Sequence, residues 1–387
     1  MDFTYNEEQE AVRGLADRLF DELATHERAR QIEAAGDERG PFDERLWAEL
    51  ASAGLLGIGL GEDVGGAGLD FVSVALVLEA AGRTAAYVPV LETLVAGAGA
   101  IESFGSEAQR QRWLPPVIAG DLVVTAALVE LVGEVVVPGG VEPTTTAESL
   151  AGGGWRLEGT KACVPAGLRA DLFVIPATRI GPGGPEGVGV FLVEATAAGL
   201  TKVPQSTTTG RPEALVELSG VEVGADSLLG GPTAQGPEIV AEVTERVVAG
   251  LCVLEAGACA AALALTSEYA KNREQFGKPI ATFQAVGQRA ADAYVDAEAI
   301  HLTAWQAAWR LSEGLPATAE VAVAKFWAAD GGQRVVHAAT HLHGGVGVDR
   351  EYPLHRYFLL TRQIELTLGG AHDSLARLGR ILAAEPA

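Results

Sequence analysis

The pattern of hydrophobic and polar positions divides the chain into three regions. From residue 5 to about residue 120, apolar residues recur every three or four positions, as in NEEQEAVRGLADRLFDELA, which predicts amphipathic helices. One of these helices, SEAQRQRWLPPVIAG, is expected to begin at Ser106 and to break at Pro115 and Gly120. The glycine-rich stretch GIGLGEDVGGAGLD cannot continue a helix and predicts one long loop.

Between about residues 122 and 230 the pattern is that of β-strands. Short runs rich in β-branched residues are separated by glycine and proline, and no helical pattern lies between them. The runs predicted as strands are LVVTAALVE, EVVVP, WRLEGTKACV, LFVIPA, VGVFLVE and ALVELSGVEV. Strands that follow one another in this way predict an antiparallel barrel or sandwich.

Helical periodicity returns after Gly236 and continues almost to the C-terminus. Helices this long and apolar are expected to pack as a four-helix bundle, and the all-round burial of the first one suggests oligomerisation. We therefore predict an α+β multi-domain fold with an N-terminal helical domain at 1–121, a barrel-like central β-domain at 122–234 and a C-terminal helical bundle at 235–387.

Composition narrows the classes of partner. The net charge of −23 argues against nonspecific binding of nucleic acid, which depends on lysine and arginine at the phosphates. The stretch VVAGLCVLEAGACAAALALT is long enough to cross a membrane, but Glu255 lies near its middle, so a buried helix is expected instead. The acidic N-terminus does not resemble a signal peptide, and the three cysteines form no CxxC pair, as expected of a cytoplasmic protein.

The stretch HLHGGVGVDREYPLHR, residues 341–356, combines glycines and histidines that a phosphate cradle, a metal site or a simple turn could contain. Taken alone, it is typical of a turn that ends a helix. His337 and His341 are four residues apart and could share a metal, but no Glu-x-x-His element or carboxylate cluster accompanies them. We therefore expect no metal site.

Upstream of this stretch lies YAKNREQFGKPIATFQAVGQRAAD, residues 269–292, and the β-region contains GTKACV and VEVGADSLLG. Together, the RxxFG, FQ and HxGGxG elements make the chain resemble the acyl-CoA dehydrogenase family over nearly its whole length. In that family a glutamate removes the α-proton of an acyl-CoA while the β-hydride passes to flavin. The resemblance implies FAD as cofactor, an acyl-CoA as substrate and an electron-transferring flavoprotein as electron acceptor.

The resemblance also implies which residues bind the ADP half of FAD. They are Arg273, Phe276, Gln284, His341, Gly344 and Gly345. These residue types suit the task because arginine offers forked donors to phosphate and glycine lets the backbone approach closely. In the family these elements reach the cofactor of a neighbouring subunit.

The chain departs from the family pattern at the positions of the catalytic base. An alignment without gaps on PLHR places the usual glutamate at Leu368. Some members carry the base on the long helix instead, and that position falls on Val247. Glu245 is two residues away, or about 200° around the helix, so it could act as base only if the helix register shifts locally.

The positions that contact the flavin ring depart as well. Val129 stands where a flavin-bonding threonine is usual, and Cys163-Val164-Pro165 stands where the family has Trp-x-Thr. Proline has no backbone N–H to donate. The chain thus keeps the ADP half of the site and lacks the isoalloxazine half. In this respect it resembles one subunit type of the actinobacterial α2β2 acyl-CoA dehydrogenases, some of which act on steroid side-chain thioesters.

Three functional hypotheses follow. The chain is the partner subunit of such a heteromeric dehydrogenase, supplying the adenosine side of a shared FAD site beside a homologous subunit. Alternatively, it is a self-sufficient homotetrameric dehydrogenase that uses Glu245 as base. A third hypothesis is a non-catalytic binding or scaffold protein on the same fold, because a fold alone does not determine a function.

Overall fold

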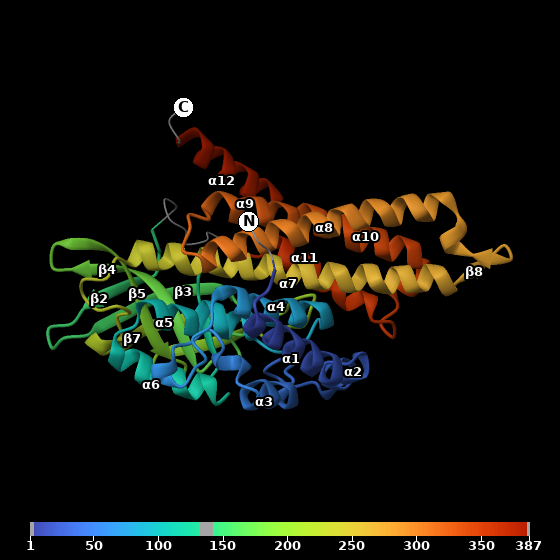
Figure 1. The fold of residues 1–387 in the computed structure, drawn as a ribbon. Coiled ribbons are helices and arrows are strands. Elements are labelled where there is room, and N and C mark those ends of the chain that lie inside the picture. Colours follow the sequence, from blue (N-terminus) through green and yellow to red (C-terminus); the bar gives the residue numbers. More distant parts are fainter. Residues whose placement is uncertain (1–3, 132–141, 385–387) are drawn as a thin grey trace. The chain divides into compact units, whose positions relative to one another are not determined.

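The structure is a computed structural model that describes residues 4–131 and 142–384 (Figure 1). The chain divides into two compact units. The bundle unit contains Met1–Arg30, Phe71–Ala86 and Val248–Ala387, and the sheet unit contains Gln31–Asp70 and Tyr87–Val247. The first helix, the fourth helix and the C-terminal helices therefore form one body, although they are far apart in the sequence.

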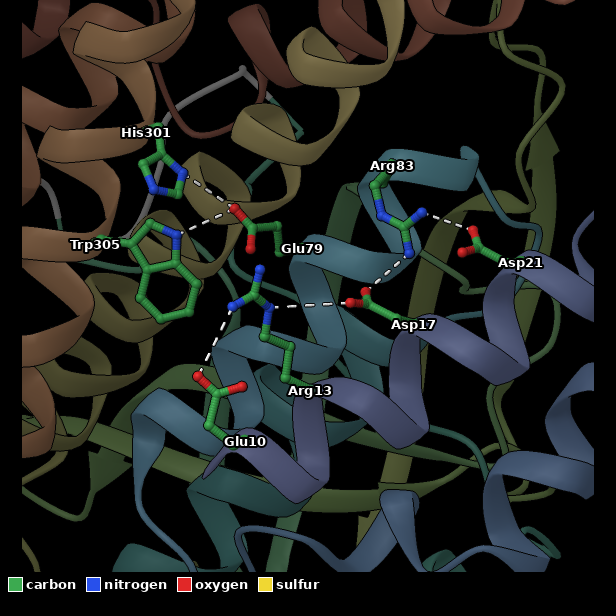
Figure 2. Close-up of polar contacts among 8 residues, drawn as sticks. All are labelled: Glu10, Arg13, Asp17, Asp21, Glu79, Arg83, His301 and Trp305. Carbon is green, nitrogen blue, oxygen red and sulfur yellow. Dashed lines mark hydrogen bonds and ion pairs between the residues drawn. The ribbon is translucent and has the colours of Figure 1, made fainter. Parts of the chain in front are cut away.

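The N-terminal helix α1 (Glu7–Leu23) begins with a capping box in which Asn6 and Gln9 bond to each other's backbone N–H groups. Its apolar face packs against α4 (Phe71–Thr84) in the bundle unit. At the edge of this contact, Arg83 bonds to Asp17 at 2.8 Å and Asp21 at 2.6 Å (Figure 2). The amphipathic helix predicted from the sequence thus has its apolar face buried, and two aspartates on its polar side form ion pairs with Arg83 of α4.

Two glycines let α4 approach the long helix α7 (Gly236–Asn272) closely. A Cβ atom at Gly82 would overlap the carbonyl of Leu254, and one at Gly257 would overlap the carbonyl of Glu79. Both glycines therefore serve backbone-to-backbone packing inside the bundle unit.

In the sheet unit the helical elements are short, apart from the beginning of α7, residues 236–247. They are α3 (Glu44–Ser52), the π-helix η3 (Leu91–Ala98), α5 (Gly99–Phe104) and α6 (Glu107–Ile118), with single 3-10 turns at Leu55–Gly57 and Glu62–Val64. The helix α2 (His26–Ala35) begins in the bundle unit and ends in the sheet unit. The glycine-rich stretch predicted as a loop begins at the last residue of the first 3-10 turn, contains the second one and has no longer helix.

Helix α6 begins as predicted, because Ser106 caps it through the N–H of Gln109. The predicted break at Pro115 is wrong, since the helix continues through both prolines to Ile118. The carbonyls that these prolines leave without a helical partner belong to Gln111 and Arg112, which are exposed, so water can satisfy them. The helix ends before Gly120, which has a φ of +79°.

The central region forms one seven-stranded sheet in the order β1-β4-β2-β3-β7-β6, with β5 on the other side of β4. The strands are β1 (Val124–Ala126), β2 (Thr146–Ser149), β3 (Trp155–Val164), β4 (Leu172–Gly181), β5 (Gly184–Glu194), β6 (Leu200–Gln205) and β7 (Glu213–Val223). A 3-10 turn follows at Ala225–Ser227. The predicted run EVVVP lies outside the described residues.

The prediction of a wholly antiparallel sheet is wrong at two places. Strands β1 and β2 both pair with β4 in parallel, β1 near its beginning and β2 near its end. Local sequence pattern does not encode such pairings, because they join segments separated by 30 or more residues. The sheet core is formed by inward-facing side chains of β3, β4, β5 and β7, including Phe173 and Phe191.

The C-terminal region is helical, as predicted. After α7 come the hairpin strands β8 (Glu274–Gln275) and β9 (Lys278–Pro279), a 3-10 turn (Ile280–Thr282), α8 (Gln284–Ser312), α9 (Thr318–Phe326), the π-helix η6 (Trp327–Gly331), α10 (Gly332–His343), η7 (Gly344–Val348), α11 (Leu354–Leu366) and α12 (Ala371–Ala384). Since α9, η6 and α10 follow one another without a break, they form one long helix. Cys259, Ile300 and Val335 join α7, α8 and α10 in a common core.

Helix α7 is long and apolar enough to cross a membrane by length and composition. However, 72% of its most apolar window is buried inside the protein, and Glu255 near the middle of that stretch is fully buried. The helix is therefore mostly buried in the protein core, as the sequence led us to expect.

Candidate functional site

The first group of predicted site residues lies on a hairpin at the end of the bundle unit, where α7 passes into α8 (Figure 1). Strands β8 and β9 pair in antiparallel fashion, which makes Phe276 and Gly277 a two-residue turn. Both residues have positive φ, 54° and 75°, as a type I′ hairpin requires. Phe276 is 93% exposed, so a large apolar ring is held in solvent on an unfavourable backbone conformation.

Arg273 and Gln284 flank this hairpin. The backbone of Arg273 is fixed, because its N–H donates to Tyr269 and its carbonyl accepts from Ile280, both at 2.8 Å. Its guanidinium is exposed and has no hydrogen-bond or ion-pair partner within residues 4–131 and 142–384. Gln284 is the exposed first residue of α8. Both polar side chains are therefore available to a group from outside this chain.

The base of the hairpin is held by Phe283. Its ring meets the Phe276 ring edge-on at 6.1 Å between centroids, and the Lys278 ammonium lies 4.6 Å from its centroid. These contacts hold the Phe276 ring in place without covering it.

The second group lies at the end of α10. Gly344, with a φ of +62°, ends the helix in a positive-φ conformation that favours glycine. Gly347 is buried, and a Cβ atom there would lie 2.8 Å from the Thr340 carbonyl, so packing within the chain requires a glycine at this position. At Gly345 neither backbone conformation nor packing requires a glycine. Its φ is ordinary, it is exposed, and a Cβ atom would meet nothing within 4 Å.

The two histidines of this motif have different environments. His341, the predicted site residue, is exposed, whereas His343 is buried. The His343 ring stacks on Tyr269 with centroids 4.4 Å apart, and its nitrogens contact the Ala339 carbonyl at 2.8 Å and the Tyr352 hydroxyl at 3.2 Å. Burial lowers the pKa of His343, partly opposed by its bond to Ala339.

The stacking of Tyr269 on His343 brings the two motifs together. Tyr269 lies one helical turn before Arg273, and His343 directly precedes Gly344. Sequence reasoning missed His343, although a signal was present. The position continues the buried stripe of Val336 and Ala339 at the spacing of an inward-facing helix residue.

The positions expected at a flavin ring lie in the sheet unit, where their backbone groups bond within the chain. The Val129 carbonyl accepts from the N–H of Ala162 at 2.9 Å, and the Pro165 carbonyl accepts from the Thr125 hydroxyl at 2.7 Å. The N–H of Cys163 donates to Gln205 at 2.7 Å. Burial, followed by the charge of Glu213, raises the pKa of the Cys163 thiol. A valine side chain at position 129 has no hydroxyl to donate.

Beside this segment lies a buried ion pair between Glu130 and Lys161. Lys161 is completely buried, and the hydroxyls of Thr144 and Thr145 also donate to Glu130. Burial lowers the pKa of Lys161, while Glu130 acts against that shift. Because both charges are paired and hydrogen-bonded, this cluster is a structural element of the sheet unit.

The candidate base positions carry no carboxylate of their own. Leu368 is half-buried in the turn between α11 and α12, with a φ of +57°. Val247 is buried in α7, and Glu245 is half-buried two residues earlier. Glu365, three residues before Leu368, pairs with Arg362 on α11.

The family models place these elements in a known class. Residues 6–121 match the acyl-CoA dehydrogenase N-terminal domain, and residues 236–378 match the acyl-CoA dehydrogenase C-terminal domain. The chain therefore belongs to the acyl-CoA dehydrogenase family. The family, the fold class and the enzyme class predicted from the sequence are confirmed, and the membership supports FAD as cofactor.

Individual relatives narrow the comparison. The chain is 40% identical to acyl-CoA dehydrogenase FadE27 of Mycobacterium tuberculosis (strain ATCC 25618 / H37Rv), over 100% of both sequences. Its structure is similar to the ChsE4-ChsE5 complex from Mycobacterium tuberculosis, with a TM-score of 0.91 and 39% identity over 100% of both chains. It is also similar to a variant of the Tcur3481-Tcur3483 steroid ACAD, with a TM-score of 0.86 and 42% identity over 97% of this chain and 98% of that one.

Proposed function

We propose that this chain is one subunit type of a heteromeric, FAD-dependent acyl-CoA dehydrogenase. It supplies the adenosine side of an FAD site that it shares with a homologous subunit, and it supplies no catalytic base. The observation that carries this proposal is Gly345. Gly345 is required by neither backbone conformation nor packing within the chain, and its open, exposed backbone lets another molecule approach closely.

The other residues at this end of the bundle unit fit the ADP half of FAD. Arg273 has an exposed guanidinium without a partner among the described residues, which suits a phosphate. Phe276 presents a ring that is 93% exposed, which suits a planar base or the apolar surface of a neighbouring subunit. Gln284 and His341 add exposed polar groups beside them.

The sheet unit does not fit the isoalloxazine half equally well. Val129 and Pro165 lack the hydrogen-bond donors that the family uses at these positions. Their own backbone carbonyls accept hydrogen bonds within the chain, from the Ala162 N–H and the Thr125 hydroxyl. When bound, FAD supplies the hydride acceptor of the reaction. This chain is proposed to hold one end of it, while the homologous subunit contributes the flavin-ring contacts and the carboxylate that takes the α-proton.

The substrate is proposed to be a bulky acyl-CoA, such as a steroid side-chain thioester. The support is the 42% identity to a protein described as a steroid ACAD. The heteromeric relatives, which are complexes of two differently named chains, support a homologous partner subunit. An electron-transferring flavoprotein is proposed as electron acceptor, and the cytoplasm as the place of action.

The proposal is tested by purifying the chain alone and together with a homologous acyl-CoA dehydrogenase subunit from the same organism. We expect little flavin in the chain alone, and FAD with acyl-CoA dehydrogenation activity in the joint complex. About one FAD per chain in the protein purified alone would favour a self-sufficient enzyme using Glu245. Absence of flavin in the complex would favour the non-catalytic scaffold.

A further inference from the structure

We propose that His343, fixed by Tyr269 and Tyr352, is a positioning residue that holds the Gly344–Val348 segment in the form that receives the FAD pyrophosphate. This inference rests on the proposed function, because it assigns the adenosine side of FAD to this chain. His343 itself is buried and acts through the segment that follows it.

The contacts of the ring determine its tautomer. A carbonyl oxygen only accepts hydrogen bonds, so Nδ1 carries the hydrogen and donates to Ala339 at 2.8 Å. In the neutral ring, Nε2 is then the acceptor, and the Tyr352 hydroxyl donates to it across 3.2 Å. Burial favours this neutral form by lowering the pKa of His343. The ring therefore has a defined orientation with both nitrogens occupied.

Three elements are joined by this ring. Tyr269, in the last turns of α7, stacks on His343 with an interplanar angle of 25°. Tyr352, in the turn after η7, meets Tyr269 edge-on at 6.5 Å between ring centroids. The glycine segment is thus anchored before its first residue by His343 and beyond its last residue by Tyr352.

The segment is packed on one side and open on the other. Behind it, a Cβ atom at Gly347 would lie 2.8 Å from the Thr340 carbonyl and 3.1 Å from the His343 Cβ atom, so the backbone fits closely against the end of α10. In front, Gly344 and Gly345 are exposed, and a Cβ atom at either would meet nothing within 4 Å. A short segment that is held at both ends by rings, packed behind against α10 and open in front is organised to receive a ligand before that ligand arrives.

The same contacts also connect the segment to Arg273. Tyr269 lies four residues before Arg273 on the same stretch of chain, and its carbonyl accepts the Arg273 N–H at 2.8 Å. One stacking contact therefore fixes the start of the hairpin and the start of the glycine segment relative to each other. Loss of that contact is expected to affect both parts of the adenosine side together.

The test uses conservative variants in the assembled complex. Tyr352→Phe removes only the hydroxyl that bonds to His343 and keeps the ring contacts. His343→Phe keeps an aromatic ring for stacking but removes both hydrogen bonds. Tyr357→Phe is the matched control, because Tyr357 is also a partly buried tyrosine of the bundle unit that donates one hydrogen bond, to the Arg83 carbonyl at 2.8 Å.

The measurements are the equilibrium affinity of the complex for added FAD, the melting temperature without flavin, and hydrogen–deuterium exchange of residues 344–348. We expect Tyr352→Phe to weaken FAD binding by about three- to tenfold, the usual effect of one hydrogen bond. His343→Phe should weaken it further, and both should speed exchange in the segment. Tyr357→Phe should lower the melting temperature by as much as Tyr352→Phe while leaving FAD affinity unchanged.

A wild-type FAD affinity in both His343→Phe and Tyr352→Phe would overturn the inference. So would a loss of affinity that Tyr357→Phe reproduces at the same melting temperature, because the effect would then reflect general stability. Arg273→Ala separates this inference from the proposed function. If Arg273→Ala weakens FAD binding and the His343 and Tyr352 variants do not, only the positioning role falls. If Arg273→Ala also binds FAD normally, the proposed function falls with it.

Discussion

The Glu79 carboxylate on α4 accepts a hydrogen bond from the ring of His301 on α8, across 3.1 Å (Figure 2). The same carboxylate oxygen accepts from the Trp305 indole at 3.1 Å. The bond to Glu79 is the main cause that raises the pKa of His301, against the opposing effect of burial. The link between the N-terminal helix α4 and the C-terminal helix α8 is therefore strongest when His301 is protonated.

This link predicts a pH dependence of stability. A histidine whose pKa is raised by folding stabilises the protein fully below its ordinary pKa of about 6.5, and that contribution is lost as pH rises through the raised value. Urea unfolding between pH 6 and pH 9 should show a smaller loss of stability in His301→Gln than in the wild type. His372→Gln, which changes an exposed histidine on α12, should keep the wild-type slope. Equal slopes in all three proteins would contradict the account.

Glu255 predicts a second pH effect in the core of the bundle unit. Burial raises the pKa of this carboxyl to about 8, although the Cys259 thiol donates to it at 3.1 Å. In the unfolded chain the Glu255 carboxyl ionises near pH 4.5, whereas in the folded chain it stays protonated up to about pH 8. The free energy of unfolding therefore decreases as the pH rises from 4.5 to about 8. Glu255→Gln should remove this loss, which is on the order of 3 kcal/mol at pH 7.

The measurement for Glu255 is the free energy of unfolding at pH 5 and at pH 7.5. The wild type should lose more stability between these values than Glu255→Gln, whose amide does not titrate. Glu320→Gln, at a partly exposed carboxylate paired with Arg310, is the control and should behave as the wild type does. A wild type as stable at pH 7.5 as at pH 5 would show that Glu255 is ionised in the folded protein.

Glu245→Gln tests whether this chain supplies the base. We expect the rate of flavin reduction by acyl-CoA in the complete complex to remain within a few-fold of the wild type. A true general base commonly contributes about 100-fold to 10,000-fold, so its removal would be unmistakable. The comparison requires equal flavin content in both complexes. A drop of that size at equal flavin content would make the self-sufficient enzyme the better interpretation.

Much of the fold could be predicted because its signals are local. The strand run from Trp155 to Val164 and the helix start at Ser106 each follow from a pattern within a dozen residues. The parallel pairing of β1 and β2 with β4 could not be predicted, because no local pattern specifies which distant strand is the neighbour. Strands β2 and β6 were not among the predicted runs. Pro204 disfavours the interior of a strand, yet β6 lies at the edge of the sheet, where a missing N–H is tolerated.

The candidate site also combines features that a local motif predicts with features that depend on distant contacts. Arg273, Phe276 and the glycines could be named from the motif, because their residue types suit phosphate and close backbone approach. Their exposure could not be foreseen, and neither could the difference between Gly345 and Gly347, which depends on packing against Thr340. The support from His343 and Tyr352 arises from a stack on Tyr269, which is 74 residues from His343 in the sequence.

This chain is proposed, above all, to hold the adenosine side of an FAD bound with a homologous partner subunit. The most direct measurement is the FAD content and FAD affinity of the purified complex carrying Arg273→Ala in this chain only. Loss of one charge-assisted phosphate contact typically costs about 1.5 to 3 kcal/mol, so we predict affinity lower by roughly 10- to 150-fold, with intact assembly and melting temperature. Unchanged FAD content and affinity in that complex would contradict the account.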